Sequence, residues 1–364
     1  MTLSTRIVDR MTDWITGSEP VDRFTLARAL GSAPDSIETN SCLDVIASLG
    51  LSDVSVKFRN RTSLWWDLAV VSAAGIPGHI YIAQKGDDGL TGVRASVDSF
   101  SPPRTPDDLL SLLEGVGLTA AVHCRGADIG ERRPAVSSLA KVFVVLAVLE
   151  LVDKDDLGLD DSVTIHADDL SFLGSQIGPQ HIGREVSLRR LCINIAQQSC
   201  NTSTDILTRT VGSQRVFEVA NECGAGITEP LPLTRDWVES AWGSLVEESL
   251  SDYSAHDAAL RSVCWSLPRH DDGLDYHLPL TAISSALARI ARCSWNPWSG
   301  ALPPVGKRRI FKGGNAPGVM AGAWLGHPDA DFAFAVNSPR AIGLLEEIWI
   351  HDMSHGFYSR MVEN

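Results

Sequence analysis

The sequence predicts an α+β protein in which an antiparallel sheet is flanked by helices, preceded by a smaller α+β unit. A proline-rich stretch, residues 99–106, separates the first hundred residues from the rest of the chain. Beyond it the pattern runs from one strand through many helices to three strands and a last helix, which is typical of this class. We therefore expect a small domain over residues 1–100, a linker over 101–106 and a larger domain over 107–364.

The N-terminal unit combines short helices with strands. Apolar stripes predict helices over residues 7–15 and 24–30. Runs rich in β-branched and aromatic residues predict strands over 54–58, 63–72 and 78–84, with a hairpin-like segment between the last two. No residues in this unit form a chemical motif, so packing or partner binding is its default role.

The larger domain opens with a helix over residues 105–113, because Pro106 and the acidic residues after it suit a first helical turn. An apolar strand follows at 118–124. The remaining helices are expected at 137–152, 187–198, 202–223 with a break at Gly212, 234–247, 280–292 and 340–362. The remaining strands are expected at 309–312, 319–325 and 332–336.

Composition limits the classes of function. The 364 residues include 31 Lys+Arg and 45 Asp+Glu, so the formal net charge is 31 − 45 = −14. This charge argues against nucleic acid or an anionic membrane surface as partner, and no apolar run reaches the roughly 18 residues of a membrane span. The N-terminus lacks the apolar core of a secretory signal. Seven scattered cysteines without a CxxC pair indicate a cytoplasmic protein without a zinc framework.

The first chemical motif is Ser138-Leu139-Ala140-Lys141, at the start of a strongly apolar predicted helix. A serine and a lysine three residues apart share one side of a helix. The helix N-terminus stabilises negative charge on the serine oxygen, and the apolar residues after Lys141 favour a desolvated amine with a lowered pKa. A neutral lysine is one way to activate a serine hydroxyl as a nucleophile.

Two further motifs follow: Ser199-Cys200-Asn201 between two predicted helices, and Lys312-Gly313-Gly314 on a predicted strand. Enzymes with an S-x-x-K motif carry S-D-N and K-T-G in these positions. A second serine can relay a proton, and glycines let a substrate lie close to the strand. The backbone N–H beyond those glycines can share an oxyanion with that of the nucleophile. The three motifs in this order indicate acyl chemistry on Ser138.

With these motifs the sequence resembles the class A β-lactamase-type serine hydrolases, which are related to the penicillin-binding proteins. The resemblance covers residues 106–364 and extends through Arg133–Lys141, Asn201–Leu207 and Phe311–Trp324. The last run is similar to one branch of the family, which includes the esterase-like serine hydrolase encoded in the clavulanic acid biosynthetic cluster. That branch carries a smaller steroid-isomerase-like N-terminal domain, so the resemblance implies a shortened version of it over residues 1–100.

The resemblance implies a role for each of four catalytic residues. Ser138 is the acylated nucleophile and Lys141 is its base. Ser199 is the proton relay, and Lys312 is the electrostatic anchor. No metal and no organic cofactor is implied, and the partner is a small ester or β-lactam-like molecule. The sequence leaves the oligomeric state open.

The resemblance also implies the substrate-facing residues. Asn201 contacts the substrate or Lys141. Gly313 and Gly314 lie against the substrate, and the backbone N–H groups of Ser138 and Asn315 form the oxyanion hole.

Three departures from the family pattern bear on the reaction. Cys200 replaces the aspartate of S-D-N, and Gly313 replaces the threonine of K-T-G. The stretch 231–237 lacks the glutamate that activates the deacylating water in class A β-lactamases, and neither Glu229 nor Asp236 can be assigned that task from sequence. We therefore expect ester cleavage with weak or no β-lactamase turnover. The alternatives are acyl transfer in natural-product biosynthesis and a catalytically silent binding protein.

Overall fold

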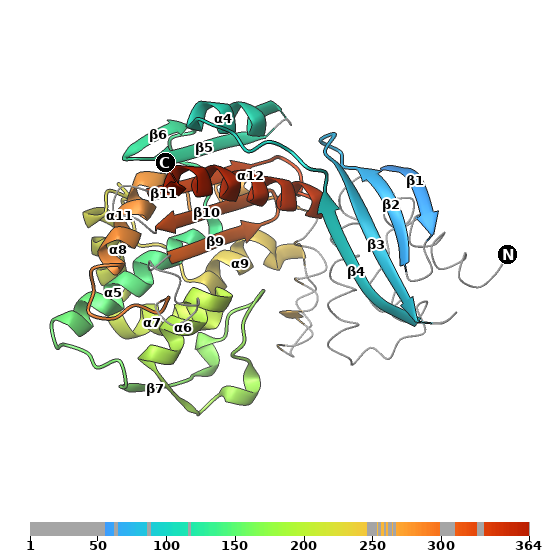
Figure 1. Ribbon diagram of the computed structural model, residues 1–364. Coiled ribbons are helices and arrows are strands. Elements are labelled where there is room, and N and C mark those ends of the chain that lie inside the picture. Colours follow the sequence, from blue (N-terminus) through green and yellow to red (C-terminus); the bar gives the residue numbers. More distant parts are fainter. Residues whose placement is uncertain are drawn as a thin grey trace. The chain divides into compact units, whose positions relative to one another are not determined.

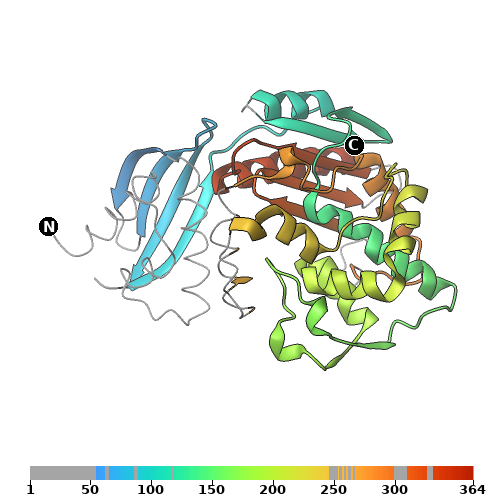
Figure 2. The same ribbon diagram turned by 180° about the vertical axis from the view of Figure 1, so that it is seen from behind.

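The chain separates into two compact units, which are described individually (Figures 1 and 2). The computed structural model describes residues 55–61, 65–85, 89–115, 118–245, 253, 256–257, 260, 264, 267–298, 310–325 and 331–363. The first unit comprises Met1–Pro103, Gly115–Gly117 and Ala341–Phe357, and the second comprises Arg104–Glu114, Leu118–Arg340 and Tyr358–Asn364.

The first unit contains a four-stranded antiparallel sheet in the order β1-β2-β3-β4. Its strands are β1 (Ser55–Arg61), β2 (Trp65–Val71), β3 (Pro77–Lys85) and β4 (Gly89–Val97). Leu68 and Ile80 are paired across β2 and β3 and are fully buried, so one face of the sheet packs against protein. The sequence did not predict β4, whose two glycines lower its strand propensity. The helices expected at 7–15 and 24–30 lie outside the described residues.

The second unit is built on a five-stranded antiparallel sheet in the order β6-β5-β11-β10-β9. The strands are β5 (Thr119–Cys124), β6 (Ala127–Gly130), β9 (Ile310–Ala316), β10 (Val319–Leu325) and β11 (Asp331–Asn337). This confirms the predicted mixture of helices with an antiparallel sheet. β9, which carries Lys312, is an edge strand, so one side of its backbone is not paired with another strand.

The predicted helices are present, with shifted ends, and most of the last one belongs to the first unit. They are α4 (Pro106–Gly115), α5 (Lys141–Asp153), α6 (Leu188–Gln198), α7 (Asn201–Val211), α8 (Ser213–Glu222), α9 (Thr234–Trp242), α11 (Leu280–Ile290) and α12 (Leu344–Glu363). α11 packs across β5, β10 and β11, and α5 packs against α11, α7 and α8. The predicted break at Gly212 is confirmed, since this glycine has a φ of 85° between α7 and α8. The sequence did not predict the short pair β7 (Ser162–Thr164) and β8 (Glu185–Ser187).

The predicted helix over 137–152 requires a correction at its start. Residues Ser137–Ala140 form a 3₁₀ turn, and the α-helix begins at Lys141. Ser137 has a φ of 47°, which is incompatible with a right-handed helix. Ser138 therefore lies on a tight turn in front of α5 and not within its first α-helical turn.

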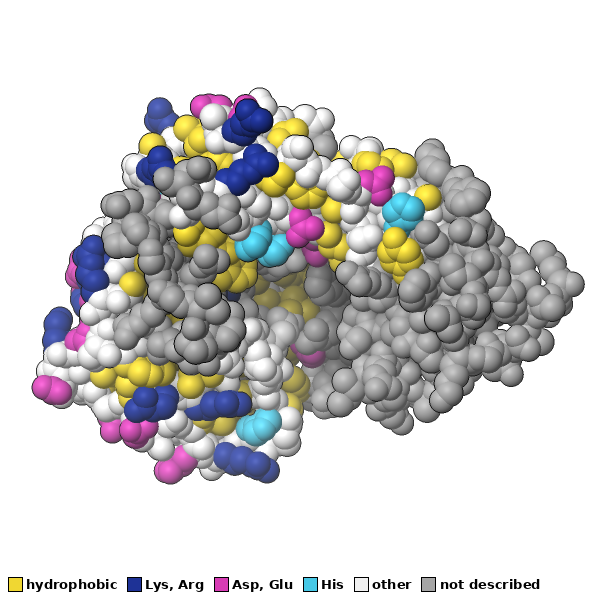
Figure 3. All heavy atoms as spheres, viewed as in Figure 1, with side chains coloured by type: hydrophobic (Ala, Val, Ile, Leu, Met, Phe, Trp, Pro, Cys, Tyr) yellow, Lys and Arg dark blue, Asp and Glu magenta, His cyan; other side chains and the backbone are white. Residues whose placement is uncertain are grey.

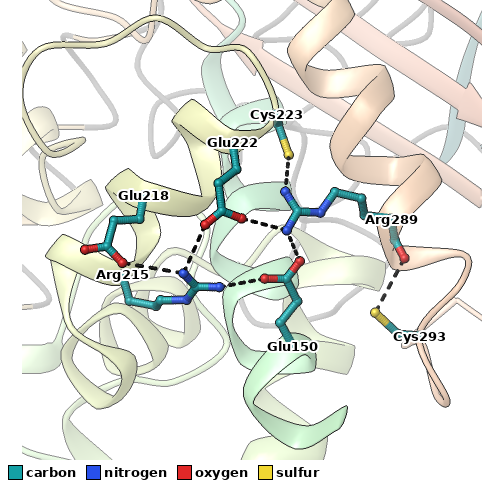
Figure 4. A network of polar contacts seen from close by, with 7 residues as sticks. All are labelled: Glu150, Arg215, Glu218, Glu222, Cys223, Arg289 and Cys293. Carbon is teal, nitrogen blue, oxygen red and sulfur yellow. Dashed lines mark hydrogen bonds and ion pairs between the residues drawn. The ribbon is translucent and has the colours of Figure 1, made fainter. Parts of the chain in front are cut away.

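A charged network holds the helix layer together at the end of α5 (Figure 4). Glu150 on α5 accepts hydrogen bonds from Arg215 on α8 and from Arg289 on α11. Both arginines also bond Glu222 on α8. Glu150 and both arginines are only partly exposed, whereas Glu222 is exposed, so the bonds to Glu150 contribute more than solvated surface pairs do.

Candidate active site

Ser138 is the one accessible side chain in an otherwise buried segment. From Pro134 to Leu149 every residue except Ser138 is buried. Within the described residues neither its hydroxyl nor its backbone N–H has a hydrogen-bond partner. A half-buried serine in front of a fully buried helix is well placed for a ligand to reach.

Ser199 is held at the corner between α6 and α7. It follows α6 in the left-handed conformation, with a φ of 55°, and its N–H bonds back to the carbonyl of Ile195. Glycine is the usual residue at such a helix end. A serine here is strained, which is common where a side chain serves a site.

Both motif lysines converge on the Ser199 side chain. Nζ of Lys312 lies 2.8 Å from Oγ of Ser199, and Nζ of Lys141 lies 3.3 Å from the same oxygen. Lys141 also donates to the Ser199 carbonyl at 2.6 Å. The structure thus brings together three residues that the sequence separates by up to 171 positions.

Burial sets the protonation of the two lysines. Lys141 and Lys312 are 2% and 3% exposed, and no carboxylate lies within ion-pair distance of either among the described residues. Desolvation lowers the pKa of Lys141 to about 8, partly opposed by Asp205. Desolvation and the charge of Lys141 lower the pKa of Lys312 well below its usual value. Two neighbouring buried ammonium groups are costly, so the pair gives up a proton more readily than exposed lysines do.

Both the oxygen and the nitrogen of the Asn201 side-chain amide are hydrogen-bonded within the protein. Its Oδ1 accepts from Nζ of Lys141, and its Nδ2 donates to the carbonyls of Phe172 and Leu173 at 2.6 and 2.8 Å. Of the two contacts expected from the sequence, the structure shows the one with Lys141. Asn201 thereby links the lysine to the segment that carries Leu173.

Cys200 is the N-cap residue of α7. Its Sγ accepts the backbone N–H of Ser203 at 3.4 Å, and its carbonyl accepts the Thr204 hydroxyl. The Cys200 side chain is completely buried. The replacement of aspartate by cysteine therefore leaves the N-terminal turn of α7 capped, by a weaker acceptor.

The edge strand β9 lies directly against the Ser138 turn. A Cβ on Gly314 would lie 2.3 Å from the carbonyl oxygen of Val136 and 3.1 Å from the nitrogen of Ser138. Only glycine fits this approach. The Pro317–Gly318 hairpin pairs Ala316 with Val319, and backbone groups alternate along an antiparallel strand. The N–H and C=O of Asn315 therefore point away from β10, towards the outer edge of the sheet and the Ser138 turn.

The stretch 231–237, which lacks the family's water-activating glutamate, places Thr234 against Asp205. Asp205 of α7 accepts hydrogen bonds from the N–H and hydroxyl of Thr234, both at 2.8 Å, and from the N–H of Arg235 at 3.0 Å. These bonds cap α9. Glu229 and Asp236 are exposed and have no contact with the motif residues, so neither is placed as a base.

A small cavity lies behind Lys141, with room for about one water molecule. Lys141, Asp205, Thr234 and Tyr276 contribute to its lining. Desolvation raises the pKa of Asp205 to about 6, although the bonds from Thr234 and Arg235 oppose this rise. Sequence reasoning missed Asp205, although it lies four residues after Asn201 and therefore on the same face of α7.

The comparisons with known proteins agree with the motifs. Residues 130–260 match the family described as the beta-lactamase enzyme family. This match supports a β-lactamase-like assignment for that part of the chain, and with it an enzyme of the serine hydrolase class. It includes Ser138, Lys141, Ser199 and Asn201 and ends before Lys312. No curated protein is significantly similar to the chain.

Several solved structures are similar to the chain at low identity. A β-lactamase from Sphaerobacter thermophilus is 18% identical, covering 70% of this chain and 96% of that one, with a TM-score of 0.44. PBP-A is 16% identical, with coverages of 73% and 100% and a TM-score of 0.44. A class A β-lactamase from Mycobacterium abscessus is 19% identical, with coverages of 71% and 98% and a TM-score of 0.43. At such identities the chemistry must be argued from this chain's own residues.

Three further observations concern the described residues as a whole. They contain no helix long and apolar enough to cross a membrane and no cluster of three His, Cys, Asp or Glu side chains suited to a metal ion. On the face drawn in Figure 3, the described basic and acidic side chains are interspersed over the surface.

Proposed function

We propose that the protein is a serine hydrolase that forms an acyl-enzyme on Ser138 and cleaves a small ester. The observation that carries this proposal is the pair of buried lysines that share the Ser199 hydroxyl. A neutral amine in such a pair can accept a proton, and the accessible Ser138 lies on the turn that leads into Lys141.

The reaction follows from these positions. Oγ of Ser138 attacks the ester carbonyl carbon while its proton passes to neutral Nζ of Lys141. The N–H groups of Ser138 and Asn315 stabilise the oxyanion. The C–O bond to the alcohol then breaks, and Ser199 passes a proton to the leaving oxygen and regains one from a flanking lysine. Water attacks the acyl group, which leaves as the carboxylic acid and restores Ser138.

We assign the substrate to small natural-product or β-lactam-related esters, with weak or no β-lactamase turnover. The resemblance of Lys312–Val319 to the esterase-like branch supports this class. An ester has a better leaving group than an amide, so it depends less on a dedicated base for water. The resemblance also assigns residues 1–100 to a shortened steroid-isomerase-like domain, and this stays a prediction.

Acyl transfer is the second candidate, and one observation favours it. The segment after the second motif presents Thr234 to Asp205, whereas Glu229 and Asp236 are exposed. Without an equivalent of the glutamate that activates the deacylating water in class A β-lactamases, the acyl-enzyme would persist until an amine or alcohol arrived. A catalytically silent binding protein is the remaining alternative.

The test is intact-mass measurement after incubation with p-nitrophenyl acetate, a fluorophosphonate, penicillins and 3′-acetoxy cephalosporins. We expect an adduct on the parent chain that is absent from Ser138→Ala. Ser284→Ala is the matched control, because it removes a buried hydroxyl from α11. Rapid adduct loss with acid release supports the esterase, and a persistent adduct that an added amine discharges supports acyl transfer. A folded parent that no reagent labels would overturn both catalytic readings.

A further inference from the structure

Ser137, the residue before the proposed nucleophile, has an unusual backbone. Its φ is 47°, and its side chain is 1% exposed. The left-handed region is unfavourable for residues with a Cβ and is tolerated only where neighbouring structure enforces it. No role was predicted for Ser137 from the sequence, so the question is what holds it there.

Two hydrogen bonds fasten Ser137 to separate parts of the second unit. Its hydroxyl donates to the carbonyl oxygen of Asn315 on β9 at 3.0 Å. Its N–H donates to Oδ1 of Asp275 at 2.8 Å. The side chain thus bonds to the edge strand β9, while the backbone bonds to the segment that carries Asp275.

The segment around Asp275 is itself tied to the approach to Ser138. The N–H of Val136 donates to the carbonyl of Tyr276 at 3.0 Å, and the N–H of Leu278 donates to the carbonyl of Pro134 at 3.1 Å. A β-bridge joins Ala135 to His277. Asp275 therefore belongs to a rigid support for the turn.

We propose that Ser137 and Asp275 are positioning residues that set the spacing of the two oxyanion donors, an inference that rests on the proposed function. The Ser137 carbonyl and the Ser138 N–H belong to one peptide unit, and the N–H and C=O of Asn315 point to the same strand edge. A bond from the Ser137 hydroxyl to the Asn315 carbonyl thus joins the two halves of the pocket. Gly314 permits the approach, and the Ser137 bond sets it.

The backbone strain at Ser137 allows a positioning role to be distinguished from a purely structural one by two substitutions. Ser137→Gly removes the hydroxyl and also the backbone strain, since glycine adopts positive φ freely. Ser137→Ala removes the hydroxyl but keeps the strain. A residue that only stabilised the fold would show activity that followed stability across these two variants. A positioning residue would show equal losses of activity in both, whatever their stabilities.

The experiment measures the first-turnover release of p-nitrophenolate from p-nitrophenyl acetate and the inhibition constant of phenylboronic acid, which forms a tetrahedral adduct with a serine. We expect Ser137→Gly to melt at or above the temperature of Ser137→Ala. In both variants acylation should slow by roughly 10- to 100-fold and phenylboronic acid should bind more weakly by a similar factor, because misplaced oxyanion donors weaken transition-state binding. Ser284→Ala is the control and should keep both values near those of the parent.

The outcomes separate this inference from the function on which it rests. If the parent is acylated on Ser138 and both Ser137 variants keep parental acylation and boronate affinity, the positioning role is wrong and the hydrolase remains. If activity falls only in the less stable variant, Ser137 is structural. If a folded parent is neither acylated nor inhibited, the proposed function fails, and this inference fails with it.

Discussion

The Nζ atom of Lys312 lies 2.8 Å from the Oγ atom of Ser199, in the buried floor of the site. Lys141 approaches the same oxygen from α5 at 3.3 Å. One hydroxyl thereby connects a strand lysine with a helix lysine, and protein desolvation disfavours the charged form of both. This arrangement makes the protonation of the pair, rather than that of either lysine alone, the variable that should control acylation.

Acylation should accelerate as pH rises. Desolvation lowers the pKa of Lys141 to about 8, and only the neutral amine accepts the Ser138 proton, so the rate should rise through that pH and level off above it. Measurement of the p-nitrophenolate burst between pH 6 and 10 checks this. Lys141→Ala should slow acylation by about 10²- to 10⁴-fold. A pH-independent rate in the parent would rule out Lys141 as the base.

Asp205→Asn should move that pH profile to lower values. Above its own pKa of about 6 the Asp205 carboxylate favours the ammonium form of Lys141, so its removal should lower the lysine pKa further. The asparagine keeps an oxygen acceptor for the N–H groups of Thr234 and Arg235. Glu229→Gln, at an exposed acid, is the control and should leave the profile unchanged. An unshifted profile in a folded Asp205→Asn variant would contradict the coupling.

A buried histidine should make stability depend on pH. His123 is 2% exposed and lies between Asp128 and Asp331, at 2.6 and 2.8 Å. Burial lowers the His123 pKa, but the two carboxylates outweigh it and raise the pKa to about 9. The hydrogen bond from His123 lowers the pKa of Asp331 to about 2.

The pKa shifts of His123 and Asp331 affect stability at opposite ends of the pH range. The histidine contribution is complete below about pH 6.5 and is lost as pH rises through 9, and the Asp331 contribution is complete above about pH 4 and is lost as pH falls through 2. Urea unfolding at fixed pH values checks both limbs. His123→Gln should cost about 3 kcal/mol near pH 6 and abolish the upper limb. Because Lys141 and Lys312, whose pKa values are lowered, gain stability over the same pH range, the parent is compared with His123→Gln. An identical pH dependence of the two proteins from pH 7 to 10 would contradict a protonated His123.

Glu150→Gln should destabilise the protein without slowing acylation. The substitution weakens the bonds from Arg215 and Arg289 and leaves two partly buried cations short of a counter-charge. We expect a loss of about 1–2 kcal/mol in unfolding free energy, measured by urea denaturation. Since Glu150 lies at the far end of α5 from Lys141, the p-nitrophenolate burst should stay within about twofold of the parent. A large loss of burst rate would show that the network also serves the site.

The sequence by itself determined the α+β class and the main elements of the larger domain. It also singled out Ser138, Lys141, Ser199 and Lys312 as candidates. This was possible because apolar periodicity, the Gly212 break and motif order are local properties of the chain. Strands with weak propensity, such as β4, escaped notice because they form only against a neighbouring strand.

Tertiary structure decided how those candidates are used. Only the packed structure shows that the Asn201 amide is hydrogen-bonded to Lys141 and to the carbonyls of Phe172 and Leu173. Only packing brings Asp205 beside Lys141, and Ser137 between Asp275 and Asn315. These relationships join residues that lie far apart in the chain, and their distances and burial arise from the fold as a whole. The roles assigned to the motif residues therefore remain predictions that the proposed variants can test.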